Sequence, residues 1–351
     1  MSADPVRLLK ITGSASVVDR AEMETKMKWN ELADRVIDGE EVTREEAKAI
    51  VDAPDSELLA VLHAAYKVRS HHHGNKVRVH VLQNAKSGVC PEDCAFCSQS
   101  MKYNNDVEQY GLQSPEELLE GAKEAHEKGA VTYCMVTATR GPSWNEIDDI
   151  CEAVETIKDQ YDMEICASLG LLKEGQAEKL AEAGVDKYNH NLETSSNHFP
   201  NLVSTHDFED RVRTVTLAKQ AGMAACCGGI IGMGEDKDDW VDLAFTLRDL
   251  EVESVPVNFL NPRPGTPMDG ADPPRPQECL KALAMFRFVH PDVDVRVAGG
   301  REVVLGSMQP MALYAANSFF SDGYLTTGGQ GESEDAVMLR QAGFEPEVIE
   351  A

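Results

Sequence analysis

The sequence predicts an α/β fold, a (βα)8 TIM-type barrel that follows an N-terminal helical extension. The chain has 351 residues, a length that suits one large α/β barrel or two average domains. From Lys76 onward, eight short β-type runs alternate with amphipathic helical stretches, whereas the residues before Lys76 show helical patterning only. An open, doubly wound parallel sheet is the alternative for the same alternation.

We expect three parts along the chain. Residues 1–75 form the helical extension, in which Thr43 to Glu46 has the capping-box pattern of a helix start. Residues 76–325 form the barrel. Residues 326–351 form a C-terminal tail that packs on or near the barrel.

The barrel elements follow one another in regular order. Apolar, β-branched and alternating runs predict eight strands, at residues 77–83, 131–137, 164–170, 185–192, 223–231, 255–260, 293–298 and 316–320. Amphipathic periodicity predicts helices between them, at residues 114–129, 144–160, 174–184, 208–222, 238–250 and 277–289. Several of these helices end at a glycine, the usual residue after a helix C-cap.

Composition excludes some classes of partner. The chain has 60 acidic and 33 basic residues and a formal net charge of -27, which would repel nucleic acid and anionic membrane surfaces. The sequence has no apolar run of about 18 residues that would span a bilayer, and its first 20 residues do not resemble a signal peptide. We therefore expect a cytoplasmic protein. In a reducing compartment, its nine cysteines indicate metal binding or catalysis more than disulfides.

Three cysteines lie close together at Cys90, Cys94 and Cys97, with C-x3-C-x2-C spacing. Thiolates are soft ligands that select zinc, copper(I) or iron-sulfur clusters. Four usually close a structural site, so three leave one position open for chemistry. We expect a [4Fe-4S] cluster whose fourth iron binds a substrate or cofactor. The alternatives are a zinc site with a fourth ligand elsewhere, or a disulfide with one spare thiol.

A second group of candidate ligands lies on different strands. Cys134, Cys166 and Cys226 fall within the second, third and fifth predicted strands, and Arg296 falls within the seventh. If these side chains point inward they converge, and could form a second, more enclosed metal site. Cysteine is also a common core residue, whereas a buried guanidinium needs a partner to offset its desolvation.

The fourth predicted strand carries Asn189, Asn191 and Glu193 at a spacing of two, which places them on one face. Amides suit a ureido or amide group, and a carboxylate suits ribose hydroxyls or a cation. Asn258 is a comparable inward candidate in the sixth strand. The alternative is that the face with Glu193 turns to solvent. The glycine-rich segment 228–234 allows close approach of a ligand to the backbone.

Taken together, these residues resemble the biotin synthase family of radical S-adenosylmethionine enzymes. The similarity runs from about Ser70 to Gly343 and is most specific in CPEDCAFCSQS, YNHNLETS, CCGGIIGMGE, ESVPVNFL and VRVAGGRE. The cysteine spacing alone would indicate only the radical S-adenosylmethionine superfamily. In one departure, Glu193 stands where several family members have aspartate.

The resemblance implies a role for each matching residue. It implies that a [4Fe-4S] cluster is bound by Cys90, Cys94 and Cys97. It implies that a catalytic, sulfur-donating [2Fe-2S] cluster is bound by Cys134, Cys166, Cys226 and Arg296. Contacts to S-adenosylmethionine are expected from Phe96, Asn191, Glu193, Arg211, Gly228, Ile230 and Gly232. Contacts to the substrate dethiobiotin are expected from Asn189, Asn191 and Asn258.

The implied activity is radical-mediated insertion of sulfur into dethiobiotin to form biotin, the last step of biotin biosynthesis. The resemblance also implies an electron donor such as flavodoxin or ferredoxin, iron-sulfur assembly machinery and a homodimer. Strand alternation lets only one of Cys226 and Cys227 face inward, and the family match selects Cys226. We expect Cys151, Cys227 and Cys279 to serve packing.

Two other functions are weighed against this activity. Another radical S-adenosylmethionine enzyme of the same barrel type would have no reason to keep Cys134, Cys166, Cys226 and Arg296 together. A non-catalytic iron-sulfur electron carrier or zinc-stabilised binding protein would need four closed ligands and no amides inside a barrel.

Overall fold

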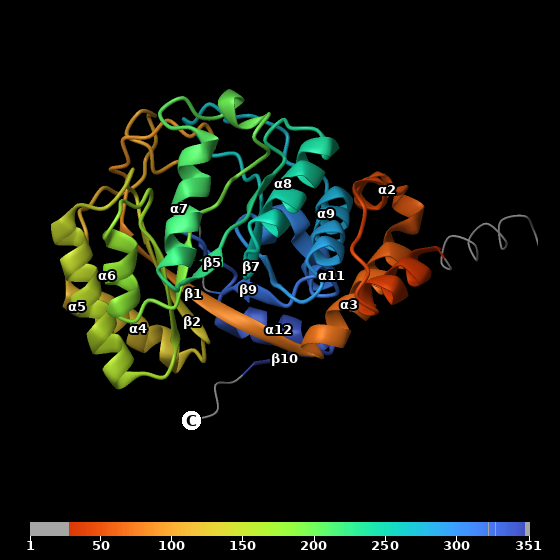
Figure 1. Cartoon of the computed structure of the whole chain (residues 1–351), viewed down its shortest axis with the longest axis horizontal. Helices are drawn as coiled ribbons and strands as arrows, with labels where there is room; N and C mark the ends of the chain where they lie inside the picture. Colours follow the sequence, from red (N-terminus) through yellow and green to blue (C-terminus); the bar gives the residue numbers. More distant parts are fainter. Residues whose placement is uncertain (1–27, 322, 327, 348–351) are drawn as a thin grey trace, which may run out of the picture.

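The computed structural model describes residues 28–321, 323–326 and 328–347 (Figure 1). The first 27 residues of the predicted helical extension, where no signal peptide is expected, lie outside the described residues. So does the end of the predicted C-terminal tail, at residues 348–351.

The described part of the N-terminal extension is helical, as predicted. Residues 28–37 form a helix, followed by α2 (Arg44–Asp52), a 3-10 turn (Asp55–Glu57) and α3 (Leu58–His73). The capping box at Thr43 and Glu46 starts α2. Both α2 and α3 pack on α9 (Pro276–Val289), and α2 also contacts α8 (Lys237–Asp249). Figure 1 shows this red and orange layer on one side of the barrel.

The strands form a closed parallel barrel, so the open doubly wound sheet is wrong. In chain order the strands are β1 (Lys76–Lys86), β2 (Thr132–Thr137), β3 (Glu164–Ser168), β4 (Lys187–Asn189), β5 (Ala224–Cys226), β6 (Gly229–Ile231), β7 (Ser254–Phe259), β8 (Asp294–Val297) and β9 (Ser318–Phe320). The strands pair in parallel in the order β1, β2, β3, β4, β5, β7, β8 and β9, β6 also pairs with β7, and β9 pairs with β1 to close the barrel. A short β10 (Glu345–Pro346), which was not predicted, adds to the start of β1.

The fifth predicted strand is divided into β5 and β6, which both pair with β7 in one continuous register. The gap lies at Cys227 and Gly228, opposite Val255 and Pro256. Proline has no N–H and removes one ladder hydrogen bond at this point. The two backbones also approach closely, since a Cβ added at Gly228 would lie 1.9 Å from the Pro256 carbonyl oxygen.

The predicted helices surround the barrel (Figure 1). Those not yet given are α4 (Pro115–Glu127), α5 (Trp144–Gln160), α6 (Gln176–Glu182) and α7 (Phe208–Gln220). The described residues also form α10 (Arg301–Leu305), α11 (Gln309–Ala312) and α12 (Glu332–Ala342), which were not predicted. Capping boxes at Ser114 and Ser143 fix the starts of α4 and α5. Among the described residues, no helix has the length and apolar character needed to cross a membrane.

Candidate active site

The C-terminal ends of the strands surround a cavity of about 300 Å³. Functional residues of parallel α/β barrels gather at this end. Strands β1 to β4 and β6 to β9 each contribute a lining residue, namely Leu82, Cys134, Cys166, Asn189, Ile230, Asn258, Arg296 and Phe320. The triplet Cys90, Cys94 and Cys97 lines the same cavity. Barrel closure therefore brings the triplet together with Cys134, Cys166 and Arg296 around one space. Cys226 does not line this cavity, but its sulfur contacts Arg296 and Asn189, which do.

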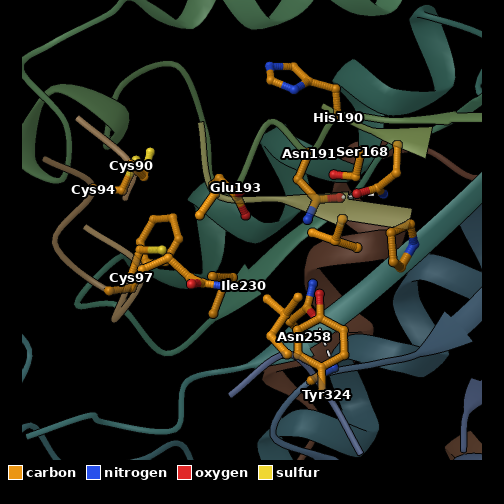
Figure 2. Close-up of a pocket in the computed structure, with 18 of the residues that line it drawn as sticks. Cys90, Cys94, Cys97, Ser168, His190, Asn191, Glu193, Ile230, Asn258 and Tyr324 are labelled. Atoms are coloured by element: carbon orange, nitrogen blue, oxygen red, sulfur yellow. Dashed lines mark hydrogen bonds between the residues drawn. The ribbon is translucent and has the colours of Figure 1, made fainter. Parts of the chain in front are cut away.

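The triplet lies in the long connection between β1 and α4, and its backbone is tightly folded. The Cys97 N–H donates to the Cys94 carbonyl oxygen at 3.0 Å, and the Met101 N–H donates to the Cys90 carbonyl oxygen at 2.8 Å. Figure 2 shows the three cysteines grouped on one side of the site, with Asn258 and Tyr324 on the other and Glu193 between.

Two acidic residues between Cys90 and Cys94 anchor the triplet to the segment before α7. Glu92 is buried and accepts from Arg140 Nη1 at 3.0 Å and from Thr205 Oγ1 at 2.5 Å. Asp93 accepts from the Ser204 N–H at 2.9 Å. Burial would raise the pKa of Asp93, but hydrogen bonds from Ser204 and Thr205 outweigh it and lower that pKa to about 2. The loop is thus held by charged groups at neutral pH.

The thiols of the triplet are strongly desolvated. Burial raises the pKa of Cys97 to about 12 and also raises the pKa values of Cys90 and Cys94. The thiolate is the form that binds metals. A positively charged centre must therefore displace the thiol protons when it binds, so binding would release protons.

Cys134, Cys166, Cys226 and Arg296 are brought together inside the barrel. Cys134 and Cys166 are register partners on β2 and β3. Arg296 Nη1 donates to the Cys226 sulfur at 3.5 Å, and all four residues are at most 3% exposed. Contact with the Cys134 thiol raises the pKa of Cys166 well above its usual range. Contact with the Cys166 thiol does the same to the pKa of Cys226.

Arg296 has a protein counter-ion, which answers the need for a partner noted from the sequence. Its Nη2 donates to Asp294 Oδ2 at 2.8 Å and to Ser254 Oγ at 3.0 Å. Asp294 lies on the same face of β8, two residues earlier. The guanidinium is therefore held through its Nη2, whereas its Nε is buried without a hydrogen-bond partner among the described residues.

Asn189, Asn191 and Glu193 all line the cavity, as their spacing predicted. Strand β4 ends at Asn189, so the other two follow on an irregular segment. Asn191 Oδ1 accepts from the Gly228 N–H at 3.1 Å. Glu193 has a φ of 71°, a conformation that non-glycine residues rarely adopt and that often marks a functional site.

Arg211 on α7 connects the triplet to Glu193. Its Nη1 donates to the Asn191 carbonyl oxygen at 2.7 Å and to Glu193 Oε1 at 3.3 Å, and its Nη2 lies 3.8 Å from the Cys94 sulfur. Glu193 Oε2 is buried without a hydrogen-bond partner in the described residues. Burial raises the pKa of Glu193 although Arg211 opposes this effect. One carboxylate oxygen is thus left for a ligand.

The other candidate contacts divide between the cavity and the neighbouring backbone. Phe96 and Ile230 line the cavity, but Gly228 and Gly232 do not. A Cβ at Gly228 would meet the Pro256 carbonyl, and one at Gly232 would meet the Pro274 ring at 2.6 Å. These glycines therefore permit close approach of neighbouring chain segments, whereas we expected approach of a ligand. Asn258 lines the cavity and bonds to the backbone of Gly229 and Gly299.

Several lining residues were not predicted from the sequence, namely Arg140, His190, His206, Arg263, Tyr324 and Thr326. Most lie on loops, where no periodicity could indicate them. His190 lies inside the quoted block YNHNLETS, between Asn189 and Asn191, where strand alternation gives no reason to expect it on the same face. Figure 2 shows its ring directed away from Asn258 and Tyr324. The three cysteines expected to serve packing, Cys151, Cys227 and Cys279, are buried in the hydrophobic core.

Two family models match the chain. The Radical SAM superfamily matches residues 85–247, and the Biotin and Thiamin Synthesis associated domain matches residues 256–345. The first range contains both the triplet and the three strand cysteines. The second contains Asn258 and Arg296.

Full-length relatives agree with these matches. The biotin synthase of Salinibacter ruber is 66% identical over 322 residues, which cover 92% of this chain and 90% of the relative. The biotin synthase of Bacillus subtilis strain 168 is 50% identical over 322 residues, covering 92% and 96%.

A solved structure supports the fold independently. The crystal structure of methylornithine synthase superposes with a TM-score of 0.80 at 22% identity, covering 90% of this chain and 97% of the other. At that identity the likeness concerns the fold alone. The barrel, the two family models and the high identity to full-length relatives together show that this chain belongs to the biotin synthase family of radical S-adenosylmethionine enzymes.

Proposed function

We propose that this chain inserts sulfur into dethiobiotin with two iron-sulfur clusters bound at opposite sides of one cavity. Membership of the family implies dethiobiotin as the substrate, together with S-adenosylmethionine and a [4Fe-4S] cluster. The observation that carries the finer proposal is that a single cavity lined by amides and a carboxylate has two separate sulfur-ligand groups in its lining, the triplet and the pair Cys134 and Cys166.

The triplet suits a cluster better than a single ion. In a cubane each thiolate binds a different iron. We assign the [4Fe-4S] cluster to Cys90, Cys94 and Cys97, with the fourth iron left for S-adenosylmethionine.

We assign the [2Fe-2S] cluster to Cys134, Cys166, Cys226 and Arg296. Two features of Arg296 support this assignment. Its Nη1 faces the Cys226 sulfur, and its Nε is a buried donor without a partner in the described residues. Such donors are rare unless a ligand completes them.

When bound at Cys90, Cys94 and Cys97, the first cluster would supply the electron for reductive cleavage of S-adenosylmethionine, and the second, at Cys134, Cys166, Cys226 and Arg296, would supply the sulfur. The protein's part is to bind, orient and shield the reactants. Glu193 lies between the triplet and the asparagines, where its free oxygen can accept from ribose hydroxyls.

The asparagines can recognise a ureido group. Asn189 Nδ2 donates to the Cys226 carbonyl oxygen at 3.2 Å, which leaves the Asn189 side-chain oxygen to accept from a ureido N–H. Asn191 uses its oxygen on Gly228, which leaves its NH2 group to donate to a ureido oxygen. The two amides therefore offer complementary groups near the strand cysteines.

The test is anaerobic reconstitution of the full chain, with Cys166→Ala and the matched control Cys279→Ala. Cys279 is buried in α9, outside the cavity lining. We expect the parent and the control to hold two spectroscopically distinct clusters and to form biotin. Cys166→Ala should lose the two-iron signal, keep the four-iron signal, and still release 5'-deoxyadenosine without biotin.

One outcome contradicts the two-cluster proposal: a single cluster type that survives in Cys166→Ala. Turnover of S-adenosylmethionine by the parent without biotin would favour a different radical enzyme. Four further proposals rest on the family alone. They are an electron donor such as flavodoxin or ferredoxin, the iron-sulfur assembly machinery as a partner, a homodimer, and a cytoplasmic location.

A further inference from the structure

Four arginines line the active-site cavity, and three of them already have a carboxylate partner. The pairs are Arg140 with Glu92 at 3.0 Å, Arg211 with Glu193 at 3.3 Å, and Arg296 with Asp294 at 2.8 Å. The fourth is Arg263. Among the described residues it takes part in no ion pair, and its Nε is buried without a hydrogen-bond partner.

The position of Arg263 places its charge toward the mouth of the cavity. Strand β7 ends at Phe259, so Arg263 lies four residues beyond the strand end, whereas Asn258 lies within the strand. Arg263 is half-buried. It lines both the active-site cavity and a neighbouring cavity that shares Ser98 and Thr326 with it.

The loop that carries Arg263 is well supported. Thr266 Oγ1 donates to the Arg263 carbonyl oxygen at 2.8 Å. Gly265 has a φ of +79°, and a Cβ at this residue would lie 2.0 Å from the Asn104 carbonyl oxygen. The loop therefore packs directly on the segment that follows the cysteine triplet. Because the loop is already ordered, less conformational entropy is lost when the Arg263 side chain binds a ligand.

A partly desolvated guanidinium without a counter-ion is costly, and an anionic ligand would offset this cost. Exposed Asp106 and Glu108 line only the neighbouring cavity and do not pair with Arg263. Dethiobiotin has a ureido ring at one end and a carboxylate at the other. With the ring at the asparagines near the strand cysteines, the carboxylate has to extend toward the mouth.

We propose that Arg263 binds the carboxylate of dethiobiotin and so selects acid substrates over neutral analogues. This inference rests on the proposed function. The other anion available in the same cavity is the carboxylate of S-adenosylmethionine. Arg211, whose Nη2 lies 3.8 Å from the Cys94 sulfur, is the cation that we expect to meet that carboxylate.

The experiment measures equilibrium binding to the anaerobically reconstituted full chain with S-adenosylmethionine present. The ligands are dethiobiotin and its uncharged primary amide. The variants are Arg263→Gln, Arg263→Lys and the control Arg213→Gln. Arg213 lies on the exposed side of α7 and pairs with Asp210, so the control removes the same charge away from the cavity.

We expect Arg263→Gln to raise the dissociation constant of dethiobiotin by about 10- to 100-fold, as for loss of a hydrogen bond to a charged group. Its affinity for the amide, its iron content and its affinity for S-adenosylmethionine should match those of the parent. The dissociation constant of Arg263→Lys for dethiobiotin should lie between those of the parent and of Arg263→Gln, because lysine keeps the charge but lacks the planar guanidinium fork. Arg213→Gln should bind both ligands like the parent.

Two results would overturn the inference while leaving the proposed function intact. Equal weakening of dethiobiotin and its amide by Arg263→Gln would mean that the residue only shapes the loop. Weakened binding of S-adenosylmethionine alone would assign Arg263 to the cofactor. Failure of the parent chain to bind dethiobiotin would overturn the proposed function itself, and the inference with it.

Discussion

The ion pair between Asp294 and Arg296 gives a stability prediction that can be worked out from its contacts. The two side chains are 8% and 1% exposed. Besides Arg296, Asp294 accepts from Ser254 Oγ at 3.0 Å, Asn317 Nδ2 at 3.0 Å and Ser318 Oγ at 2.5 Å. Asp294→Ala removes the acceptor of all four donors and leaves the Arg296 charge buried.

The expected loss of unfolding free energy is large, because Asp294→Ala removes one partner of a buried ion pair. Such changes cost about 3–5 kcal/mol. For a chain of this size, about 2 °C per kcal/mol converts this loss to a fall of about 6–10 °C in Tm. Burial would raise the pKa of Asp294, but Arg296, His80, Ser318 and Lys187 together outweigh it and lower that pKa well below the usual range. The carboxylate is thus ionised in the folded state.

The assay is thermal unfolding at neutral pH, after anaerobic removal of iron from every variant so that cluster content does not enter the comparison. Asp292→Ala is the matched control, because Asp292 lies two residues earlier and is exposed. The double variant Asp294→Ala with Arg296→Met removes both charges and should recover at least half of the loss. If Asp294→Ala destabilises no more than Asp292→Ala, the argument from a buried pair is wrong.

Two further predictions concern the backbone and pH. Gly228→Ala, whose Cβ would lie 1.9 Å from the Pro256 oxygen, should lower stability by about 1–3 kcal/mol. It should also weaken dethiobiotin binding, because the Gly228 N–H holds Asn191. Gly111→Ala, with no atom within 4 Å, is the control, and equal effects in a binding titration would contradict the overlap argument. Burial would raise the pKa of Glu164, but Lys187 and Arg78 outweigh it and lower that pKa from 4.5 to about 2. Its stabilising contribution is therefore complete above about pH 4.5 and is lost as the pH falls toward about 2. Glu164→Gln should flatten the dependence of urea unfolding on pH in that range, and an unchanged dependence would refute the assignment.

Much of the fold could be predicted because its signals are local. Alternation of apolar residues placed the strands, and the capping box at Thr43 and Glu46 marks a helix start whatever the tertiary context. The division of the fifth strand could not be predicted in this way. It depends on Pro256, about thirty residues later in the sequence, which faces Gly228 only after β7 has paired.

The candidate site also has features that local sequence patterns indicate and features that depend on the tertiary structure. Strand periodicity indicated that Cys134, Cys166, Cys226 and Arg296 could converge, and the structure brings them together. Periodicity ends where a strand ends, so it could not foresee the positive φ of Glu193. Nor could it foresee which glycines contact neighbouring segments.

By itself, the sequence determined the barrel class, the two groups of cysteines and the resemblance to one family, because spacing and periodicity are properties of neighbouring residues. Only the tertiary structure decided which charges are paired. Arg296 meets Asp294 and Arg211 meets Glu193, whereas Arg263 meets no carboxylate among the described residues. The physical reason is that a charge interaction depends on distance and burial, and barrel closure sets both for residues that lie far apart in the chain.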